Sequence, residues 1–213
     1  MAKAIHARGG EKRLRAVQSQ HLEMEITFLP GNSQGSLVVD IKRPGKLRQE
    51  LTLGGKTYLQ VLDGGTGWAT VLPGPSPIRE LSADEVKNLR GPADLDGPLM
   101  DAKSKGNQVE FVARERVGDA DAYKLKVTGK DGTVRYDYLD ARTFLEIKWE
   151  GTVMAGKPVI TESFFGDFRK VNGVMLPFRI DSDTEGTLQR QAIVVHKLIL
   201  NQVPDSAFQR PSK

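Results

Sequence analysis

The sequence predicts a mainly β protein with a few helices, in which a curved antiparallel sheet forms an incomplete, unclosed β-barrel covered by helices. Three features predict this fold. Apolar and polar residues alternate with a period of two over many short segments, which is typical of strands with one buried face. Turn-forming segments separate them, and the chain contains 22 Gly and 11 Pro. One stretch in the middle of the chain has helical spacing instead. We expect about ten or eleven strands.

The alternation is clearest near the start of the chain. Residues 30–35 are rich in turn formers and lie between two alternating segments. Two such segments joined by a turn predict an antiparallel hairpin. Its apolar positions are Leu22, Met24, Ile26 and Phe28, followed by Leu37, Val39 and Ile41.

Further strands are expected along the rest of the chain, again bounded by glycine, proline and asparagine. They cover residues 47–53, 58–62, 68–72, 109–113, 122–128, 134–139, 144–151, 159–165, 178–182 and 192–200.

Helical spacing occurs in two places. Residues 10–20 carry Leu14 and Val17 three positions apart among charged residues, which predicts a short amphipathic helix. Ser82 followed by Glu85 is a capped helix start, and a second helix is expected over 95–102, interrupted by Gly97-Pro98. We therefore predict a helical insertion over residues 78–102. No linker or repeat divides the sequence, so we expect a single domain over residues 1–213.

Composition excludes several classes of protein. The chain has 213 residues and no cysteine, which removes disulfides and thiolate chemistry. No apolar run approaches the ~20 residues of a transmembrane helix. The net charge of +4 is mild, and basic residues are not interleaved with aromatics, so no nucleic acid is expected as a partner. We expect a monomer.

Three motifs could suggest chemistry, and each has a simpler interpretation. Residues 31–35 match Gly-x-Ser-x-Gly, but strands are expected on both sides, whereas a nucleophile elbow lies between a strand and a helix. His21, Glu23 and Glu25 share one strand face that should point to solvent. Residues 63–67 are glycine-rich, yet no Lys-Ser/Thr follows. We therefore expect no enzyme activity, no metal site and no cofactor.

The aromatic and aliphatic strand residues are the candidates for a ligand site, because an unclosed sheet would expose them to a cavity. Alternation predicts that one set shares the concave face while the charged residues between them, such as Lys124, Asp137 and Glu146, face the other way. The predicted cavity-lining residues are Leu37, Val39, Ile41, Arg43, Trp68, Tyr123, Leu125, Val127, Tyr136, Tyr138, Leu145, Ile147 and Trp149.

Several stretches follow one another in a characteristic order. They are the helix and long strand at the start, residues 35–44, the turn at 63–64 ahead of Trp68, and residues 140–145, 168–177 and 200–208. In this order they resemble the LolA family of periplasmic lipoprotein carriers and its wider superfamily. The resemblance covers nearly the whole chain and implies an open barrel with an apolar cavity for acyl chains. It also implies that Arg43 bonds helices across the cavity mouth, here the segment 78–102. The alternative is that Pro44 ends the strand and the Arg43 side chain points to solvent.

The expected function is non-enzymatic binding of an acyl chain, lipid or lipoprotein, as a carrier or sensor in the bacterial cell envelope. The expected location is the periplasm or envelope, although the sequence shows no signal peptide. An alternative is a protein-interaction module with a closed core, such as the accessory domain of a larger exported peptidase. Cavity volume would separate the two.

Overall fold

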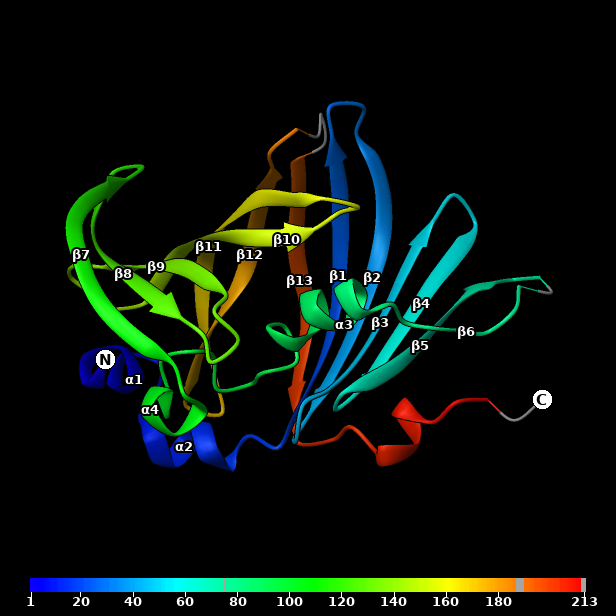
Figure 1. The fold of residues 1–213 in the computed structure, drawn as a ribbon, viewed down its shortest axis with the longest axis horizontal. Coiled ribbons are helices and arrows are strands. Elements are labelled where there is room, and N and C mark those ends of the chain that lie inside the picture. Colours follow the sequence, from blue (N-terminus) through cyan, green and yellow to red (C-terminus); the bar gives the residue numbers. More distant parts are fainter. Residues whose placement is uncertain (75, 187–189, 212–213) are drawn as a thin grey trace. The chain divides into compact units, whose positions relative to one another are not determined.

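The computed structural model describes residues 1–74, 76–186 and 190–211. Over these residues the chain is mainly β, and the strands far outnumber four short α-helices and one 3-10 helix (Figure 1). The helices are α1 (Ala2–Ala7), α2 (Glu11–Ala16), α3 (Ala83–Arg90), α4 (Ala102–Lys105) and η1 (Asp205–Phe208). The strands are β1 (Ser19–Leu29), β2 (Ser33–Lys42), β3 (Lys46–Leu53), β4 (Lys56–Asp63), β5 (Thr66–Leu72), β6 (Arg79–Glu80), β7 (Gln108–Val117), β8 (Ala120–Thr128), β9 (Val134–Asp140), β10 (Glu146–Met154), β11 (Pro158–Val171), β12 (Val174–Thr184) and β13 (Arg190–Leu200).

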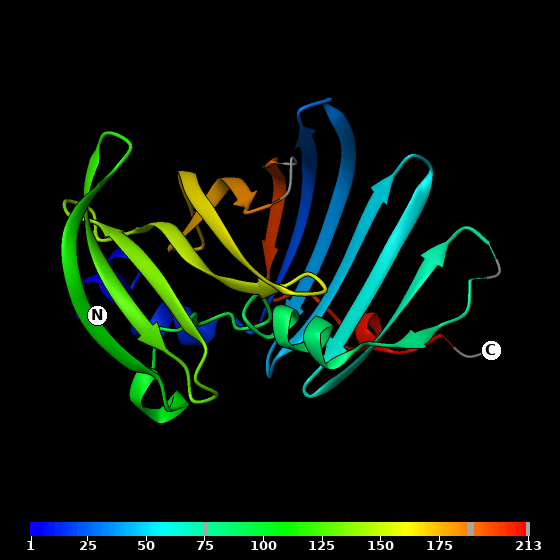
Figure 2. The same ribbon diagram turned by 45° about the horizontal axis from the view of Figure 1, so that its top comes forward.

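The chain divides into two compact units. Unit 1 contains Met1–Ala16 and Asp96–Ala192, and unit 2 contains Val17–Leu95 and Ile193–Lys213. In unit 2 the strand order is β6-β5-β4-β3-β2-β1-β13, and in unit 1 it is β12-β11-β10-β9-β8-β7. Neighbouring strands run side by side as long hairpins in both units (Figures 1 and 2).

The sheet is antiparallel and open. Every strand pair with a described register is antiparallel. Strands β6 and β7 each have a strand neighbour on one side only, so the sheet does not close into a barrel. The predicted fold class, a mainly β protein with an unclosed antiparallel sheet and a few helices, is confirmed.

The helical predictions were correct in part. Helix α2 lies within the predicted 10–20 segment, and α3 begins at the predicted Ser82 cap. The helix expected over 95–102 is wrong, because only α4 forms, from Ala102 onward. Gly97 adopts a φ of +71° and Pro98 follows it, so the backbone of this stretch cannot continue a helix. Helix α1 and the two-residue strand β6 were not predicted.

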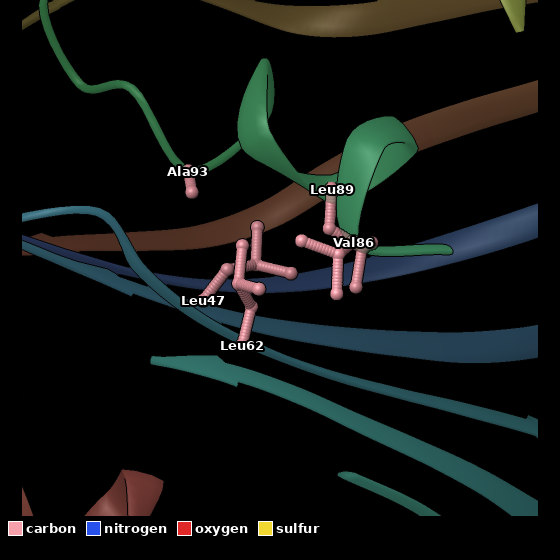
Figure 3. Close-up of a cluster of buried hydrophobic side chains, with 5 residues drawn as sticks. All are labelled: Leu47, Leu62, Val86, Leu89 and Ala93. Carbon is pink, nitrogen blue, oxygen red and sulfur yellow. The ribbon is translucent and has the colours of Figure 1, made fainter. Parts of the chain in front are cut away.

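The core of unit 2 lies on both sides of its strands. Leu62 and Val61 are adjacent in β4 and both are completely buried, so the two faces of this strand are both covered. One cluster joins Leu47 and Leu62 to Val86, Leu89 and Ala93 of the α3 segment (Figure 3). The other joins Val61 and the C-terminal segment through Leu59, Trp68, Val203 and Phe208.

In unit 1, helix α1 lies beside the start of β12. The backbone N–H of Met175 donates a 2.9 Å hydrogen bond to the carbonyl of Arg8. Gly9 permits this approach, because a Cβ there would lie 2.4 Å from the carbonyl oxygen of Gly173. The N-terminal residues are therefore part of the unit 1 structure.

The cluster around Leu62 predicts a large effect of truncation. Leu62→Ala should lower the free energy of unfolding by about 2–5 kcal/mol, because the cavity it leaves is lined by both sheet and helix. Leu72→Ala is the control, since Leu72 is 45% exposed and should change stability by about 0.5 kcal/mol or less. Chemical denaturation measures both. Equal effects of the two substitutions would contradict this view of the core.

Candidate functional site

Strands β1–β5 have two faces of different character. Register partners in adjacent antiparallel strands point to the same side of a sheet. On one side, which we call the α3 face, Ile41 pairs with Leu47 and Leu47 with Leu62, the residues that α3 covers. On the other side, which we call the η1 face, Val61 pairs with Trp68 against the segment that contains η1.

The α3 face carries an uninterrupted row of large apolar side chains. Successive register partners cross five strands in one line. We call this set the apolar row; its members are Met24, Leu37, Leu51, Tyr58 and Val71.

The apolar row lies four residues along the strands from Leu47 and Leu62, which α3 covers, and two residues from Val39, which packs at the edge of that cluster. None of its members belongs to the α3 cluster or packs against it. Tyr58 is 44% exposed and Leu37, Leu51 and Val71 are half-buried, whereas Met24 at the β1 end of the row is buried. A hollow of about 400 Å³ lies at the Tyr58 end and is also lined by Val71, Pro77 and Arg79. The row is therefore an apolar surface with space beside it.

Polar side chains separate the apolar row from the α3 cluster. Gln49 and Gln60 pair across β3 and β4, and the Gln49 amide donates to the Gln60 oxygen at 2.6 Å. The Gln60 amide donates in turn to Glu85 Oε1 of α3 at 3.3 Å. This chain of hydrogen bonds connects the sheet to the first turn of α3.

Glu85 holds the start of α3 by several bonds. The Arg79 guanidinium donates to both of its carboxylate oxygens, at 2.8 and 2.6 Å. The backbone N–H of Ser82 donates to Glu85 Oε2 at 2.9 Å, which completes the capping box. The bonds from Arg79, and then that from Ser82, lower the pKa of Glu85 to about 2. The carboxylate therefore stays charged and fixes α3 over its half of the face.

Among the predicted ligand residues in unit 2, Leu37, Val39 and Ile41 lie together on the α3 face. Trp68 does not. Its register partner is Val61, so it lies on the η1 face, and it is buried against Val203 and Phe208. Its assignment to the same face as Leu37 is wrong, because the β4–β5 turn pairs Leu62 with Gly67 and places Trp68 one position further on.

The shared face predicted for β8–β10 is also wrong. Tyr138 pairs with Lys124 and Lys148, and Tyr136 pairs with Lys126, so both tyrosines lie on the lysine-bearing face. The loop 129–133 pairs Thr128 with Val134, so even-numbered residues of β8 lie opposite even-numbered residues of β9. The odd-numbered Tyr123 and the even-numbered Tyr138 therefore point to opposite sides of the sheet. Each strand alternates as predicted, but the register between them is offset by one residue. The opposite face carries Tyr123, Leu125, Val127 and Trp149 together with Arg135, Asp137 and Glu146.

Two predicted residues lie at irregular positions. Leu145 precedes β10, and its carbonyl accepts from the N–H of Asp140 at 2.9 Å. Ile147 lies where the β9–β10 register shifts, between Glu146 and Lys148. A bulge of this kind is not visible in an alternation pattern. Ligand contact by these residues stays a prediction.

Arg43 lies at the end of β2 in unit 2. Its Nε donates to the carbonyl of Val17 at 2.8 Å, and its backbone N–H donates to the carbonyl of Gln18 at 3.0 Å. The guanidinium thus holds the residues that lead into β1. A bond from Arg43 to the segment 78–102 stays a prediction.

The motifs that could suggest chemistry lie in turns or on a charged strand face. Residues 31–35 begin in the turn between β1 and β2, with a strand on each side, and residues 63–67 join β4 to β5. His21 lies between carboxylates, with Nδ1 2.6 Å from Asp40 Oδ1 and Nε2 3.2 Å from Glu23 Oε1. No group of three or more possible metal ligands occurs among the described residues.

Comparison with known proteins adds evidence on the fold. No protein-family model matches the sequence, and the search of curated proteins gives no significant match. Solved structures do match. A LolA superfamily protein from Nitrosomonas europaea is 17% identical with a TM-score of 0.67, over 98% of this chain and 94% of that chain. A DUF1329 family protein from Desulfovibrio piger is also 17% identical, with a TM-score of 0.65 over 97% and 94%.

A third structure carries the same fold. It is an outer membrane lipoprotein-sorting protein domain from Vibrio parahaemolyticus, 10% identical with a TM-score of 0.60, over 92% of this chain and 93% of that chain. The 213-residue chain described here has the LolA-like fold. The resemblance seen in the sequence is confirmed at the level of structure. Within the described part of this LolA-like chain, no helix has the length and apolar character needed to cross a membrane.

The bonds of Glu85 generate a prediction about α3. Glu85→Ala removes the capping box and the bonds from Arg79 and Gln60. Loss of a cap costs roughly 0.5–2 kcal/mol, so amide exchange in residues 83–90 should accelerate about two- to thirtyfold. Asp84→Ala is the control for charge at the helix start, because Asp84 is exposed on the same turn.

The same carboxylate predicts a pH dependence. Its pKa falls from an ordinary 4.5 to about 2 on folding, so its contribution is complete above about pH 4.5 and is lost as the pH falls toward 2. Protection of α3 should decline over that range in the wild type and not in Glu85→Ala. An identical decline in both proteins would show that another group is responsible.

Proposed function

We propose that this protein binds the acyl chain of a lipid or lipoprotein along the apolar row and acts as a non-enzymatic carrier or sensor in the bacterial cell envelope. The observation that carries the proposal is the row itself, an unbroken line of apolar side chains across five strands that α3 leaves uncovered. The LolA-like fold and its lipoprotein-sorting neighbour support the same role.

The dimensions of the row suit a linear apolar ligand. Neighbouring strands lie about 4.8 Å apart, so the accessible part of the row, from Leu37 in β2 to Val71 in β5, is about 14 Å long. An extended acyl chain can follow such a line. Each methylene that leaves water contributes about 0.8 kcal/mol, and the half-buried residues Leu37, Leu51 and Val71 have surface left to cover.

The polar groups between the row and α3 are already bonded to protein. The Gln49 amide donates to Gln60, the Gln60 amide donates to Glu85, and Arg79 donates to Glu85. A ligand therefore meets apolar surface in the row itself. This supports selection of the ligand by its tail rather than by its head group.

The proposal predicts a lipid bound to the purified protein. Native mass spectrometry of the full chain, purified from the periplasm of a bacterial host, should show an added mass that organic extraction releases as lipid. Leu37→Lys places a charge in the row and should weaken binding of a fluorescent acyl probe by at least about tenfold. Val38→Lys is the matched control, because Val38 lies on the η1 face between Glu23 and Glu50, and it should bind as the wild type does. No lipid, together with no binding of apolar probes, would refute the proposal.

A second prediction concerns selectivity. Lipids with equal tails and different head groups should bind with affinities within about tenfold of one another, because the surface of the row is apolar apart from the Tyr58 hydroxyl. Competition against the acyl probe measures this. Sharp discrimination among head groups would contradict binding along the row.

A further inference from the structure

Unit 1 contains a charged cluster that the proposed function does not use. Strands β9 and β10 place two carboxyl groups on either side of one guanidinium. Arg135 Nε donates to Asp137 Oδ1 at 2.5 Å, and Arg135 Nη2 donates to Glu146 Oε1 at 2.6 Å. The guanidinium also lies 5.1 Å from the ring centre of Trp149. We call Arg135, Asp137 and Glu146 the Arg135 cluster.

One carboxylate oxygen of the cluster is buried without a hydrogen bond. Asp137 is completely buried, and its Oδ2 has no hydrogen-bond partner within the described part of the chain. Its register partners in β8 and β10 are Leu125 and Trp149, which bring no charge. If both carboxyl groups ionised, two negative charges would face one positive charge, and the charge on Asp137 would be fully enclosed.

A small cavity connects the cluster to α1 and to residues 96–100. Its volume is about 20 Å³, roughly the space of one water molecule. Glu146 lines it together with Ile5, Leu99, Met100 and Phe144. The Glu146 side chain is also 29% exposed, so the carboxyl group lies between this cavity and solvent, whereas Asp137 is enclosed.

The charged groups around Glu146 come from three elements. Arg135 and Asp137 belong to β9. Arg8, at the end of α1, lines the same cavity and donates from Nη1 to the carbonyl of Asp96 at 2.7 Å. Asp96 is itself buried, and Lys3 Nζ lies 4.8 Å from the ring centre of Phe144, which lines the cavity. Arg8 thus links α1 to residues 96–100 directly beside the cluster.

We propose that the Arg135 cluster is a protonation switch that controls how tightly α1 and residues 96–100 close over this cavity. With one proton on the two carboxyl groups, the charge of the remaining carboxylate balances that of the guanidinium. When that proton is lost, the second negative charge has no partner inside. Movement of α1 and residues 96–100 then admits water to the cavity.

The electrostatics of the cluster support a transition near neutral pH. Burial, and then the charge of Asp137, raise the pKa of Glu146 to about 7, against the opposing effect of Arg135 and Arg8. Burial also raises the pKa of Asp137. Between about pH 4.5 and 7 the folded protein therefore holds a proton that the unfolded chain has released. This proton stabilises the folded state. The stabilisation is complete below pH 4.5 and is lost as the pH rises through 7.

Two measurements on the full chain test this switch. Carbon-13 NMR of labelled glutamate carboxyl groups should show one residue, absent from Glu146→Gln, that titrates near pH 7. Amide exchange in residues 1–8 and 96–102, corrected for intrinsic rates, should rise about tenfold or more from pH 5.5 to 8.5, since one pKa unit corresponds to tenfold in the equilibrium. Glu146→Gln should remain protected at both pH values.

The controls use the same strands. Glu150→Gln lies in β10 on the opposite face, beside Tyr136, and should respond to pH as the wild type does. Asp137→Asn removes the repelling carboxylate and should shift the Glu146 titration to lower pH. If Glu146→Gln fails to fold, the wild-type and Asp137→Asn titrations still decide the question. Ordinary titration of Glu146 near 4.5, or a pH response in Glu146→Gln equal to that of the wild type, would overturn the proposal.

Discussion

An antiparallel strand presents its side chains alternately to two sides, and the rest of this structure depends on how the chain covers both. In unit 2 the η1 face is closed by the C-terminal segment through Val203 and Phe208. The α3 face is closed only where Val86 and Leu89 meet Leu47 and Leu62. The apolar row lies four residues further along the same strands, about 13 Å away, because Leu51 follows Leu47 in β3 and Tyr58 precedes Leu62 in β4. Helix α3 covers the first set and leaves the second uncovered.

One carboxyl group in each unit has a strongly shifted pKa, and the two shifts have opposite directions. Glu85 lies where Arg79 and the N-terminus of α3 donate to it, and its pKa falls. Glu146 lies where burial and a second carboxyl group outweigh its bond to Arg135, and its pKa rises. The first fixes a helix over the sheet across the whole neutral range. The second makes the cover of its cavity depend on pH, so the two units respond differently to the same change of medium.

Alternation within single strands was predictable from the sequence, and the register between strands was not. Leu37 and Ile41 lie on one face because they belong to one strand, and a period of two suffices to place them. Trp68 and Tyr138 were assigned to the wrong face because their positions depend on turns that shift pairing by one residue. Ile147 lies at a register shift, and the Arg135 cluster arises where charged residues of two strands meet. The apolar row could have been found only with the pairing of Leu51 and Tyr58 in hand.

The central claim is that the apolar row holds an acyl chain, and the most direct measurement is contact between that chain and named side chains. Isotope-filtered NMR of the protein with a carbon-13-labelled fatty acid would record nuclear Overhauser effects to individual methyl groups. Bound along the row, the acyl chain should show such effects to Leu37, Leu51 and Val71 and none to Val38, which points to the η1 face. Saturated binding with effects confined to residues outside the row would contradict the account.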